Sequence, residues 1–252
     1  MTRIALVSAM HEELAAVLAR MPDEHKTVVA GREFWLGHWQ GHEVVAVLSR
    51  IGKVAAATTA TTLIERFGVT RMVFTGVAGG LAPHVQVGDV VVATEFVQHD
   101  MDASPLFPRH EVPLTGMTRF PADDALTDAL AQAAPLALHD MVGALPKSEW
   151  LNLDLAQARV HQGLIASGDR FVSQTAESQA LLRDIPDALA VEMECAAMAQ
   201  VCHDYEVPLA AVRIISDRAD DAAHVDFPRF IQTIASRYSV AVLDRLLATL
   251  PA

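Results

Sequence analysis

Carboxylate side chains stand at the ends of two apolar, β-branched stretches of the chain. One stretch ends in Glu192, with Glu194 two residues later, and the other runs directly into Ser216 and Asp217. An apolar strand gains nothing from a carboxylate at its end unless solvent, a partner or a ligand uses it, and α/β sheets bind ligands at their strand ends. Two carboxylates in different environments are also what acid–base cleavage of a glycosidic bond requires. The pattern therefore indicates a ligand site that carries the groups for that chemistry.

Two further charged residues belong with this group. Arg213 lies inside the apolar stretch that precedes Asp217, and a buried arginine needs an anion. Glu13 follows the first apolar stretch of the chain, so it could lie at the mouth of the same site. Each glutamate could equally be an acidic residue in the first turn of a helix, where the helix dipole favours negative charge. Taken together, the carboxylates and the arginine favour a ligand site.

The composition is typical of a globular protein with a large core. Of the 252 residues, 52% are hydrophobic and 20% are charged, and the formal net charge is −12. This balance argues against a nucleic-acid binder, because neutralising phosphates requires lysine and arginine, but it does not exclude a small nucleoside substrate. The eleven histidines show no metal-ligand spacing. We therefore expect no metal and no cofactor.

Neither a membrane span nor a secretory leader is expected. No apolar stretch approaches the roughly 20 residues of a membrane span, and the apolar run at Met1–Ala9 is short and followed by Glu12 and Glu13. Cys195 and Cys202 lie seven residues apart in a segment of helical spacing. A helix would hold their Cα atoms roughly 10 Å apart, which is beyond disulfide reach. These features predict a reduced, cytoplasmic protein.

Strand-like apolar runs alternate with segments of helical spacing, which predicts an α/β fold with helices on the faces of a sheet. The expected strands, the second and third joined by a hairpin turn at Gly41, are Arg3–Ala9, Phe34–Trp39, Glu43–Ser49, Arg71–Thr75, Val87–Phe96, Gly163–Ser167, Ala188–Glu192 and Leu209–Ile215. The expected helices are Glu12–Met21, Lys53–Phe67, Asp123–Ala134, Ser173–Arg183, Met193–Asp204 and Phe227–Leu250. No repeat or linker divides the chain, so we expect one domain spanning residues 1–252.

Other segments do not fit a regular element. His99–Pro121 contains four prolines, and a second irregular span runs from about Pro146 to Val160. Loops of this length inside a compact domain are usually functional or form an interface. The glycines of Gly76–Gly80 predict a turn, which could present backbone N–H groups to a ligand or be a plain tight turn. Phe171 could stack on a planar ligand or belong to the core.

A series of motifs gives the chain a resemblance to one enzyme family. It resembles the bacterial 5′-methylthioadenosine/S-adenosylhomocysteine nucleosidases of the nucleoside phosphorylase/nucleosidase superfamily, through AMHEE (9–13), SRIGKVAAA (49–57), TGVAGGLAP (75–83), VGDVVV (87–92), SGDRFV (167–172), AVEMECAAMAQVCH (190–203) and VPLAAVRIISDRAD (207–220). The resemblance implies a single nucleoside phosphorylase-like α/β domain with a twisted central mixed sheet flanked by helices. It also implies a homodimer that hydrolyses the N-glycosidic bond of 5′-thio-substituted adenosines.

The resemblance assigns roles to the acidic residues. Asp217 would protonate adenine N7, Glu13 would activate the attacking water, and Glu194 would bind the ribose hydroxyls. Adenine leaves poorly until N7 is protonated, so Asp217 must hold a proton near neutral pH, which desolvation would favour. Glu13 must instead be ionised to accept a proton from water. We group Arg213 with these three as a catalytic residue.

Substrate-binding residues complete the expected site. The resemblance places Met10, Ile51 and Phe227 at the 5′-alkylthio group, Ala78, Gly79 and Met193 at the sugar, and Phe171 and Val172 at the base. Glu192 and Ser216 are included because they adjoin the other acidic residues. In relatives, the region of the His99–Pro121 loop reaches the neighbouring subunit's pocket. We therefore expect Phe107 to contact the partner's ligand in a homodimer.

Two departures from the family pattern leave alternatives open. Val77 stands where some relatives carry a serine, and Arg50 replaces a small residue. Phosphorylases of the superfamily bring arginines to a phosphate site, so a purine nucleoside phosphorylase is the alternative enzyme, although Glu13 would repel phosphate. A nucleoside-binding sensor without turnover is a third hypothesis, but binding alone needs no base opposite an acid. The pattern does not rank methylthioadenosine, S-adenosylhomocysteine, 5′-deoxyadenosine and deoxyfutalosine-type substrates.

Overall fold

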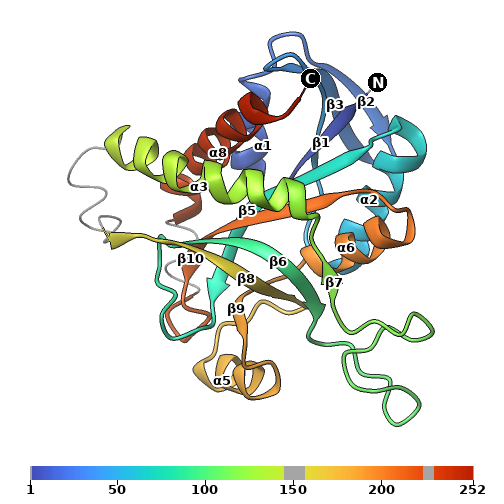
Figure 1. Cartoon of the computed structure of the whole chain (residues 1–252), viewed down its shortest axis with the longest axis vertical. Helices are drawn as coiled ribbons and strands as arrows, with labels where there is room; N and C mark the ends of the chain where they lie inside the picture. Colours follow the sequence, from blue (N-terminus) through green and yellow to red (C-terminus); the bar gives the residue numbers. More distant parts are fainter. Residues whose placement is uncertain (1, 145–156, 224–229, 252) are drawn as a thin grey trace.

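A mixed β-sheet forms the centre of the computed structural model, which describes residues 2–144, 157–223 and 230–251 (Figure 1). Four neighbouring parallel strands are β4 (His42–Leu48), β1 (Arg3–Ser8), β5 (Arg71–Gly80) and β10 (Leu209–Asp217). The antiparallel strands β3 (Arg32–Trp39) and β2 (His25–Val29) extend the sheet beyond β4. A second parallel set comprises β6 (Val90–Gln98), β8 (Val160–Ser167) and β9 (Ala188–Glu192), with the short β7 (Phe120–Pro121) beside β6.

The two parallel sets close on each other around β5. Strand β10 pairs with both β5 and β6, and the last residues of β5 pair with β9, so that β5, β10, β6, β8 and β9 form a ring. Gly79 at the end of β5 lies opposite Val191 on β9 and opposite Asp217 on β10. The ends of three strands therefore meet at one point. A twisted sheet that curls in this way brings together residues from distant parts of the sequence.

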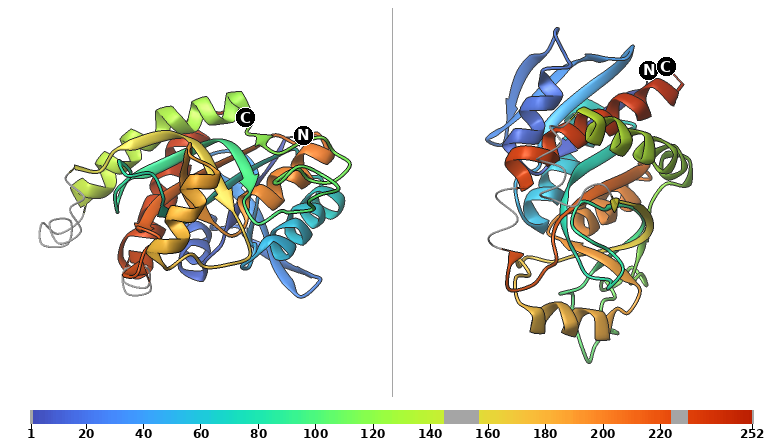
Figure 2. Two further views of the ribbon diagram at one scale, coloured as in Figure 1. Left: turned by 90° about the horizontal axis from the view of Figure 1, so that it is seen from below. Right: turned by 90° about the vertical axis from the view of Figure 1, so that its left-hand side faces the viewer.

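Helices cover both faces of the sheet (Figures 1 and 2). On one face, α1 (His11–Leu18), α3 (Asp124–Ala144) and α8 (Ser236–Thr249) bury apolar side chains such as Val17, Leu130 and Val242 in one core cluster. On the other face, α2 (Lys53–Phe67) and α6 (Cys195–Asp204) contribute Leu63 and Met198 to a second cluster. The helix α5 (Thr175–Asp184) lies at the foot of the molecule in Figure 1 and packs on a third, smaller cluster. The α/β fold with a central mixed sheet is therefore confirmed.

The glycine segment Gly76–Gly80 was expected to be a turn, and that expectation is wrong, because β5 continues through Gly80. Close contacts explain the glycines. A Cβ atom on Gly76 would lie 3.3 Å from the guanidinium carbon of Arg213, and one on Gly79 would lie 2.9 Å from Asp217 Oδ1. The small residues thus let β5 run directly beneath two charged side chains of β10.

Several element boundaries also differ from the expectation. The helix expected to end at Ala134 continues to Ala144 with Pro135 inside it, because the buried Ala137 and Met141 pack its second half into the core. The edge strand β2 was not expected, since most of its side chains are exposed and show no alternation. At the C-terminal end, the π-helical turn η2 (Ile231–Ala235) precedes α8.

Two sequence interpretations involve residues outside the described part of the chain. Phe227, expected to begin the last helix and to line the alkylthio pocket, is one of them, and so is most of the irregular span that was expected between Pro146 and Val160. Within the described ranges, no helix has the length and apolar character needed to cross a membrane. Cys195 and Cys202 both lie on α6 as expected, and both are free, buried thiols.

Candidate active site

A cavity of about 350 Å³ opens where the ends of β1, β5, β9 and β10 converge. Its lining residues come from six of the seven motifs quoted above: Ala9, Met10, Ile51, Val77, Ala78, Gly79, Phe171, Val191, Glu192, Met193, Glu194, Ser216 and Asp217. The surface is largely apolar, and its charged groups are carboxylates. Among the described residues that line it, none is a lysine or arginine. The cavity therefore presents carboxyl groups to its ligand, which suits an uncharged or cationic molecule.

Asp217 ends β10 where the pairing with β5 shifts register. Its Oδ1 accepts a hydrogen bond of 2.8 Å from the backbone N–H of Ala219, and its Oδ2 accepts one of 2.8 Å from the Ser216 hydroxyl. The residue is 2% exposed and faces Gly79 across the strand pair. These contacts fix the orientation of a carboxyl group that has little access to water at the cavity wall.

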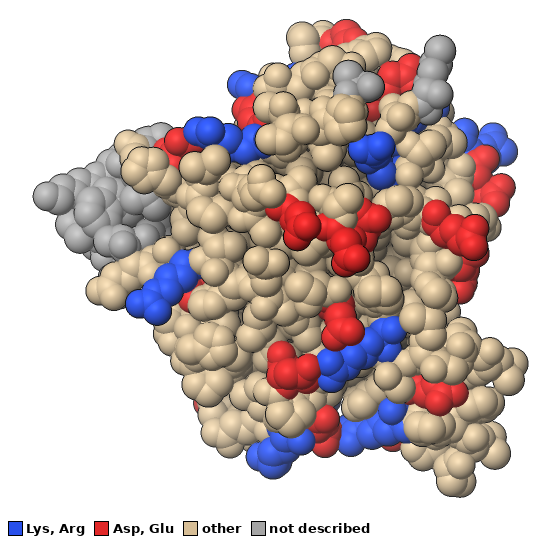
Figure 3. All heavy atoms as spheres, viewed as in Figure 1, with Lys and Arg blue, Asp and Glu red and all other residues tan. Residues whose placement is uncertain are grey.

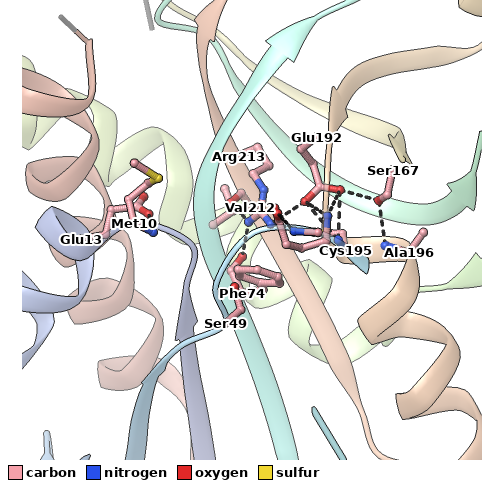
Figure 4. A network of polar contacts seen from close by, with 12 residues as sticks. Met10, Glu13, Ser49, Phe74, Ser167, Glu192, Cys195, Ala196, Val212 and Arg213 are labelled. Atoms are coloured by element: carbon pink, nitrogen blue, oxygen red, sulfur yellow. Dashed lines mark hydrogen bonds and ion pairs between the residues drawn. The ribbon is translucent and has the colours of Figure 1, made fainter. Parts of the chain in front are cut away.

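Glu192, which borders the cavity, forms a buried ion pair with Arg213 (Figure 4). The Arg213 guanidinium donates to Glu192 Oε2 at 2.9 Å, to the Cys195 sulfur at 2.9 Å and to the Phe74 carbonyl at 3.1 Å. Its carbon lies 4.1 Å from the centre of the Phe74 ring. The guanidinium is thus engaged within the protein, and Arg213 is not among the described residues that line the cavity.

The Glu192 carboxylate also holds the beginning of α6. Its two oxygens accept hydrogen bonds of 3.0 to 3.2 Å from the backbone N–H groups of Glu194 and Cys195. The Ser167 hydroxyl donates to Glu192 Oε1 and accepts from the backbone of Ala196 at 2.8 Å. Negative charge at a helix N-terminus is favourable. Glu192 therefore borders the cavity, but its hydrogen bonds position α6 and, with it, Glu194.

Glu194 points its carboxyl group toward the loop before α2. Its Oε1 accepts a hydrogen bond of 2.9 Å from the backbone N–H of Gly52, which adopts a φ of 97° that favours glycine. Burial, together with the charge of nearby Glu192, raises the pKa of Glu194 to about 8, while the Gly52 bond and Arg213 act in the opposite direction. A carboxyl group with a second oxygen at a cavity wall can accept hydrogen bonds from ligand hydroxyls.

Glu13 is fully buried in the first turn of α1. Burial raises its pKa to about 7, although the Arg213 charge and hydrogen bonds from Ser239 and Met10 lower it. The Met10 backbone N–H donates to Glu13 Oε2 at 3.3 Å, and Met10 itself lines the cavity. Glu13 is not among the described lining residues, so it lies next to the cavity wall and not in it.

The loop that carries Phe171 and Val172 is tied to the start of α2. Asp100 accepts hydrogen bonds from the Lys53 ammonium at 2.6 Å and from the Asp169 backbone at 2.9 Å, and Asp169 accepts from the Lys53 backbone at 2.8 Å. Phe171 lines the cavity and is 45% exposed as a residue, and Val172 borders an adjoining space of about 20 Å³. A flat apolar ring held at the cavity mouth is suited to stacking on a planar base.

Among the described residues that were expected at the site, Phe107 is the one that lies neither in the cavity wall nor beside it. Phe107 lies in the segment between β6 and β7, which projects from the body of the molecule at the lower right of Figure 1, and it is not among the described lining residues. Phe227 lies outside the described ranges. Three residues that hydrogen-bond the acidic groups of the site were not expected. Gly52 and Ser167 lie inside expected motifs, and Ser239 bonds Glu13 from 226 residues away.

Charge on the outer surface gives no sign of a polyanion-binding site on the visible face. In Figure 3, basic side chains lie singly or beside acidic ones and form no continuous patch on that face. Within the described residues, no group of three or more histidine, cysteine, aspartate or glutamate side chains is placed to hold a metal ion.

Comparisons with known proteins agree on one family. Residues 3–248 match the sequence profile of the Phosphorylase superfamily. The chain is 38% identical over 241 residues, 95% of both proteins, to the 5′-methylthioadenosine/S-adenosylhomocysteine nucleosidase of Anoxybacillus flavithermus. The nucleosidase of that name from Neisseria meningitidis, solved in complex with methylthio-immucillin-A, is 32% identical with a TM-score of 0.86, covering 99% of this chain and 100% of that one. The futalosine hydrolase of Helicobacter pylori is 30% identical with a TM-score of 0.83, covering 99% and 98%.

Proposed function

The chain belongs to the phosphorylase superfamily and, within it, to the 5′-methylthioadenosine/S-adenosylhomocysteine nucleosidases, and we propose a role in the reaction for each polar group of the cavity. The protein is a nucleosidase, an enzyme that hydrolyses the N-glycosidic bond of 5′-thio-substituted adenosines and releases adenine. The observation that most strongly supports the proposed roles is that Asp217 and Glu194 line one apolar cavity together with Phe171.

Asp217 is the general acid in this proposal. Cleavage of the glycosidic bond leaves negative charge on adenine, and a proton delivered to N7 neutralises it as the bond breaks. The 2% exposure of Asp217 and its fixed hydrogen bonds to Ser216 and Ala219 support delivery in one direction, toward a base that stacks on Phe171. Val172 borders the same end of the cavity and would contact the base from its backbone.

Glu194 and Glu13 act on the sugar side. The bond breaks with positive charge developing on the ribose, and the Glu194 carboxylate would hold the ribose hydroxyls and gain strength as that charge grows. Electrostatic contributions of this type are worth roughly 3–4 kcal/mol each. Glu13 would take the proton of the attacking water, which requires its ionised form. Met10, which bonds Glu13 through its backbone, would lie with Ile51 beside the apolar thioalkyl group.

Arg213 and Glu192 support the site from below. Both oxygens of Glu192 are engaged by the α6 backbone, Ser167 and Arg213, so the pair holds the helix end that carries Glu194. The ribose would pack on an apolar surface formed by Ala78, Gly79 and Met193. The likeness to a futalosine hydrolase means that other 5′-modified adenosines belong in any substrate test.

Phosphate will not take part in the reaction. Arg213 is engaged within the protein, and the Arg50 guanidinium donates to the Gly31 carbonyl, so neither cation among these residues is offered to an anion in the cavity. The assay incubates the enzyme with methylthioadenosine with and without phosphate and identifies the sugar product by mass spectrometry. We expect equal rates of adenine release and free 5-methylthioribose as the sugar product. A phosphate-dependent rate with a sugar 1-phosphate product would replace hydrolysis by phosphorolysis, and methylthioadenosine binding without adenine release would indicate a sensor.

The projecting segment between β6 and β7 is proposed to close the partner's cavity in a homodimer. Leu106 on this segment is 83% exposed and Phe107 is partly exposed, whereas Val112 is buried in the core of its own chain. An apolar surface on a projecting loop is suited to an interface.

Replacing Phe107 by alanine is expected to raise KM for methylthioadenosine by about tenfold, because a buried aromatic contact to the thioalkyl group is lost. KM for adenosine, which lacks that group, should change little, and the rate constant of the chemical step should stay the same. The measurement is steady-state kinetics on both nucleosides, with the molar mass in solution determined in parallel. Equal effects on the two substrates, or a fully active monomer, would reject the proposed contact.

A further inference from the structure

A serine interrupts the apolar side of α8 that faces the core. The buried residues of that helix are Tyr238, Ser239, Val242, Leu243, Leu246 and Leu247. Ser239 is 1% exposed, and its hydroxyl donates to Glu13 Oε1 at 3.1 Å. A hydroxyl among aliphatic side chains is unfavourable unless it is hydrogen-bonded. The bond to Glu13 accounts for a polar residue at this place.

The Glu13 carboxylate interacts with three parts of the chain. Ser239 on α8 donates to Oε1, the backbone at Ala9 and Met10 also hydrogen-bonds the group, with Met10 N–H donating to Oε2 at 3.3 Å, and the charge of Arg213 on β10 lowers its pKa. Met10 is fixed by the chain entering α1, and Arg213 is fixed by its ion pair with Glu192. Ser239 is the side chain that reaches Glu13 from a separate helix, and it can be changed without altering either of the others.

We propose that Ser239 is a positioning residue of the hydrolysis, whose hydroxyl keeps the Glu13 carboxylate oriented and ionised for taking a proton from water. This inference rests on the proposed role of Glu13 as the base. Burial raises the pKa of Glu13 to about 7, and the Ser239 hydrogen bond is one of the groups that lower it. Because a serine hydroxyl bonded to a carboxylate favours the charged form, its removal leaves a smaller fraction of the base ionised near neutral pH.

The test is the pH dependence of kcat/KM for methylthioadenosine in wild-type enzyme and in Ser239→Ala. The ratio kcat/KM reports groups of the free enzyme. We expect the acid limb that belongs to Glu13 to move upward by about one pH unit. The variant is then about tenfold less active than wild type at pH 6. The activities of the two enzymes converge toward pH 9, where Glu13 is ionised in both. KM should change little, because Ser239 is not among the described cavity-lining residues.

Dividing the activity of the variant by that of the wild type at each pH cancels the effect of ionisation at Glu194. Glu194, whose pKa is raised to about 8, has its carboxyl bonded to Gly52, and its ionisation is common to both enzymes. Ser236→Ala, one turn earlier on the same helix, is the matched control and should have the wild-type profile. Ser239→Thr keeps the hydroxyl and should restore the wild-type acid limb.

A variant-to-wild-type ratio that is the same at every pH would overturn the inference, because a merely structural serine would lower activity uniformly. An acid limb shifted equally by Ser239→Thr and Ser239→Ala would also overturn it. The underlying assignment fails separately: if Glu13→Gln retains wild-type turnover, Glu13 is not the base, whatever the Ser239 variants show. An inactive Glu13→Gln beside an unshifted Ser239→Ala rejects the role of Ser239 alone.

Discussion

Asp217→Asn will lower kcat for adenine release from methylthioadenosine by about 10²–10⁴-fold, the usual contribution of a positioned general acid. Asparagine occupies the same volume and can still accept a hydrogen bond from Ala219 N–H, which Asp217 Oδ1 accepts at 2.8 Å. Its amide can donate to the Ser216 hydroxyl, which reverses the present 2.8 Å bond. The fold is therefore retained, and what is lost is the proton for adenine N7. The measurement is single-turnover release of adenine, with thermal unfolding as the check on folding.

Asp220→Asn is the matched control for this prediction. Asp220 lies three residues further on, accepts a hydrogen bond of 3.0 Å from Ala222 and is not among the described lining residues of the cavity. It should keep wild-type turnover. An Asp217→Asn enzyme that releases adenine at close to the wild-type rate would remove Asp217 from the role of general acid.

Glu13→Gln is expected to lower kcat by a similar 10²–10⁴-fold, because the amide cannot accept a proton from water. Glutamine still accepts the Ser239 hydrogen bond and keeps its place in the first turn of α1. Binding of 5′-methylthiotubercidin, an analogue in which carbon replaces N7, should persist, since Glu13 acts on the water and not on the nucleoside. Calorimetric titration of the analogue beside a turnover assay measures the two effects separately.

Glu12→Gln provides the internal comparison, because Glu12 is the exposed neighbour on the same helix turn. Its turnover should stay close to that of the wild type. If Glu12 proves essential for turnover and Glu13 does not, the motif was aligned one residue out of register. Loss of analogue binding together with turnover in Glu13→Gln would mean that the residue holds the nucleoside rather than the water.

The regular elements were the most predictable part of the molecule. The helix α2 was predicted residue for residue as Lys53–Phe67, because its helical periodicity ends at Gly68, which adopts the left-handed conformation of a C-cap. Strand β9 was also predicted with its observed bounds. The strand through Gly76–Gly80 could not be predicted, since glycines normally indicate a turn and here serve the close approach of Arg213 and Asp217 from another strand.

The candidate site was predictable where its residues end strands. Asp217, Glu192 and Glu194 were singled out because a carboxylate at the end of an apolar run needs an explanation, and the structure brings all three to one cavity. Family resemblance, and not spacing, supplied Met10 and Ile51. Ser239 could not be found from the sequence, because its partner lies 226 residues away and a single serine in a helix carries no signal of its own.

The central claim is that Asp217 delivers a proton to the departing base, and a substrate that needs no such proton tests it most directly. In 4-nitrophenyl 5-thiomethylriboside the leaving group is a stable anion, so the glycosidic bond can break without a general acid. The decisive measurement is kcat for Asp217→Asn relative to wild type on this compound and on methylthioadenosine. We predict that the variant loses about 10²–10⁴-fold on methylthioadenosine and stays within about tenfold of wild type on the nitrophenyl compound. An equal loss on both substrates would contradict the assignment, because Asp217 would then stabilise the site by some means other than protonating adenine.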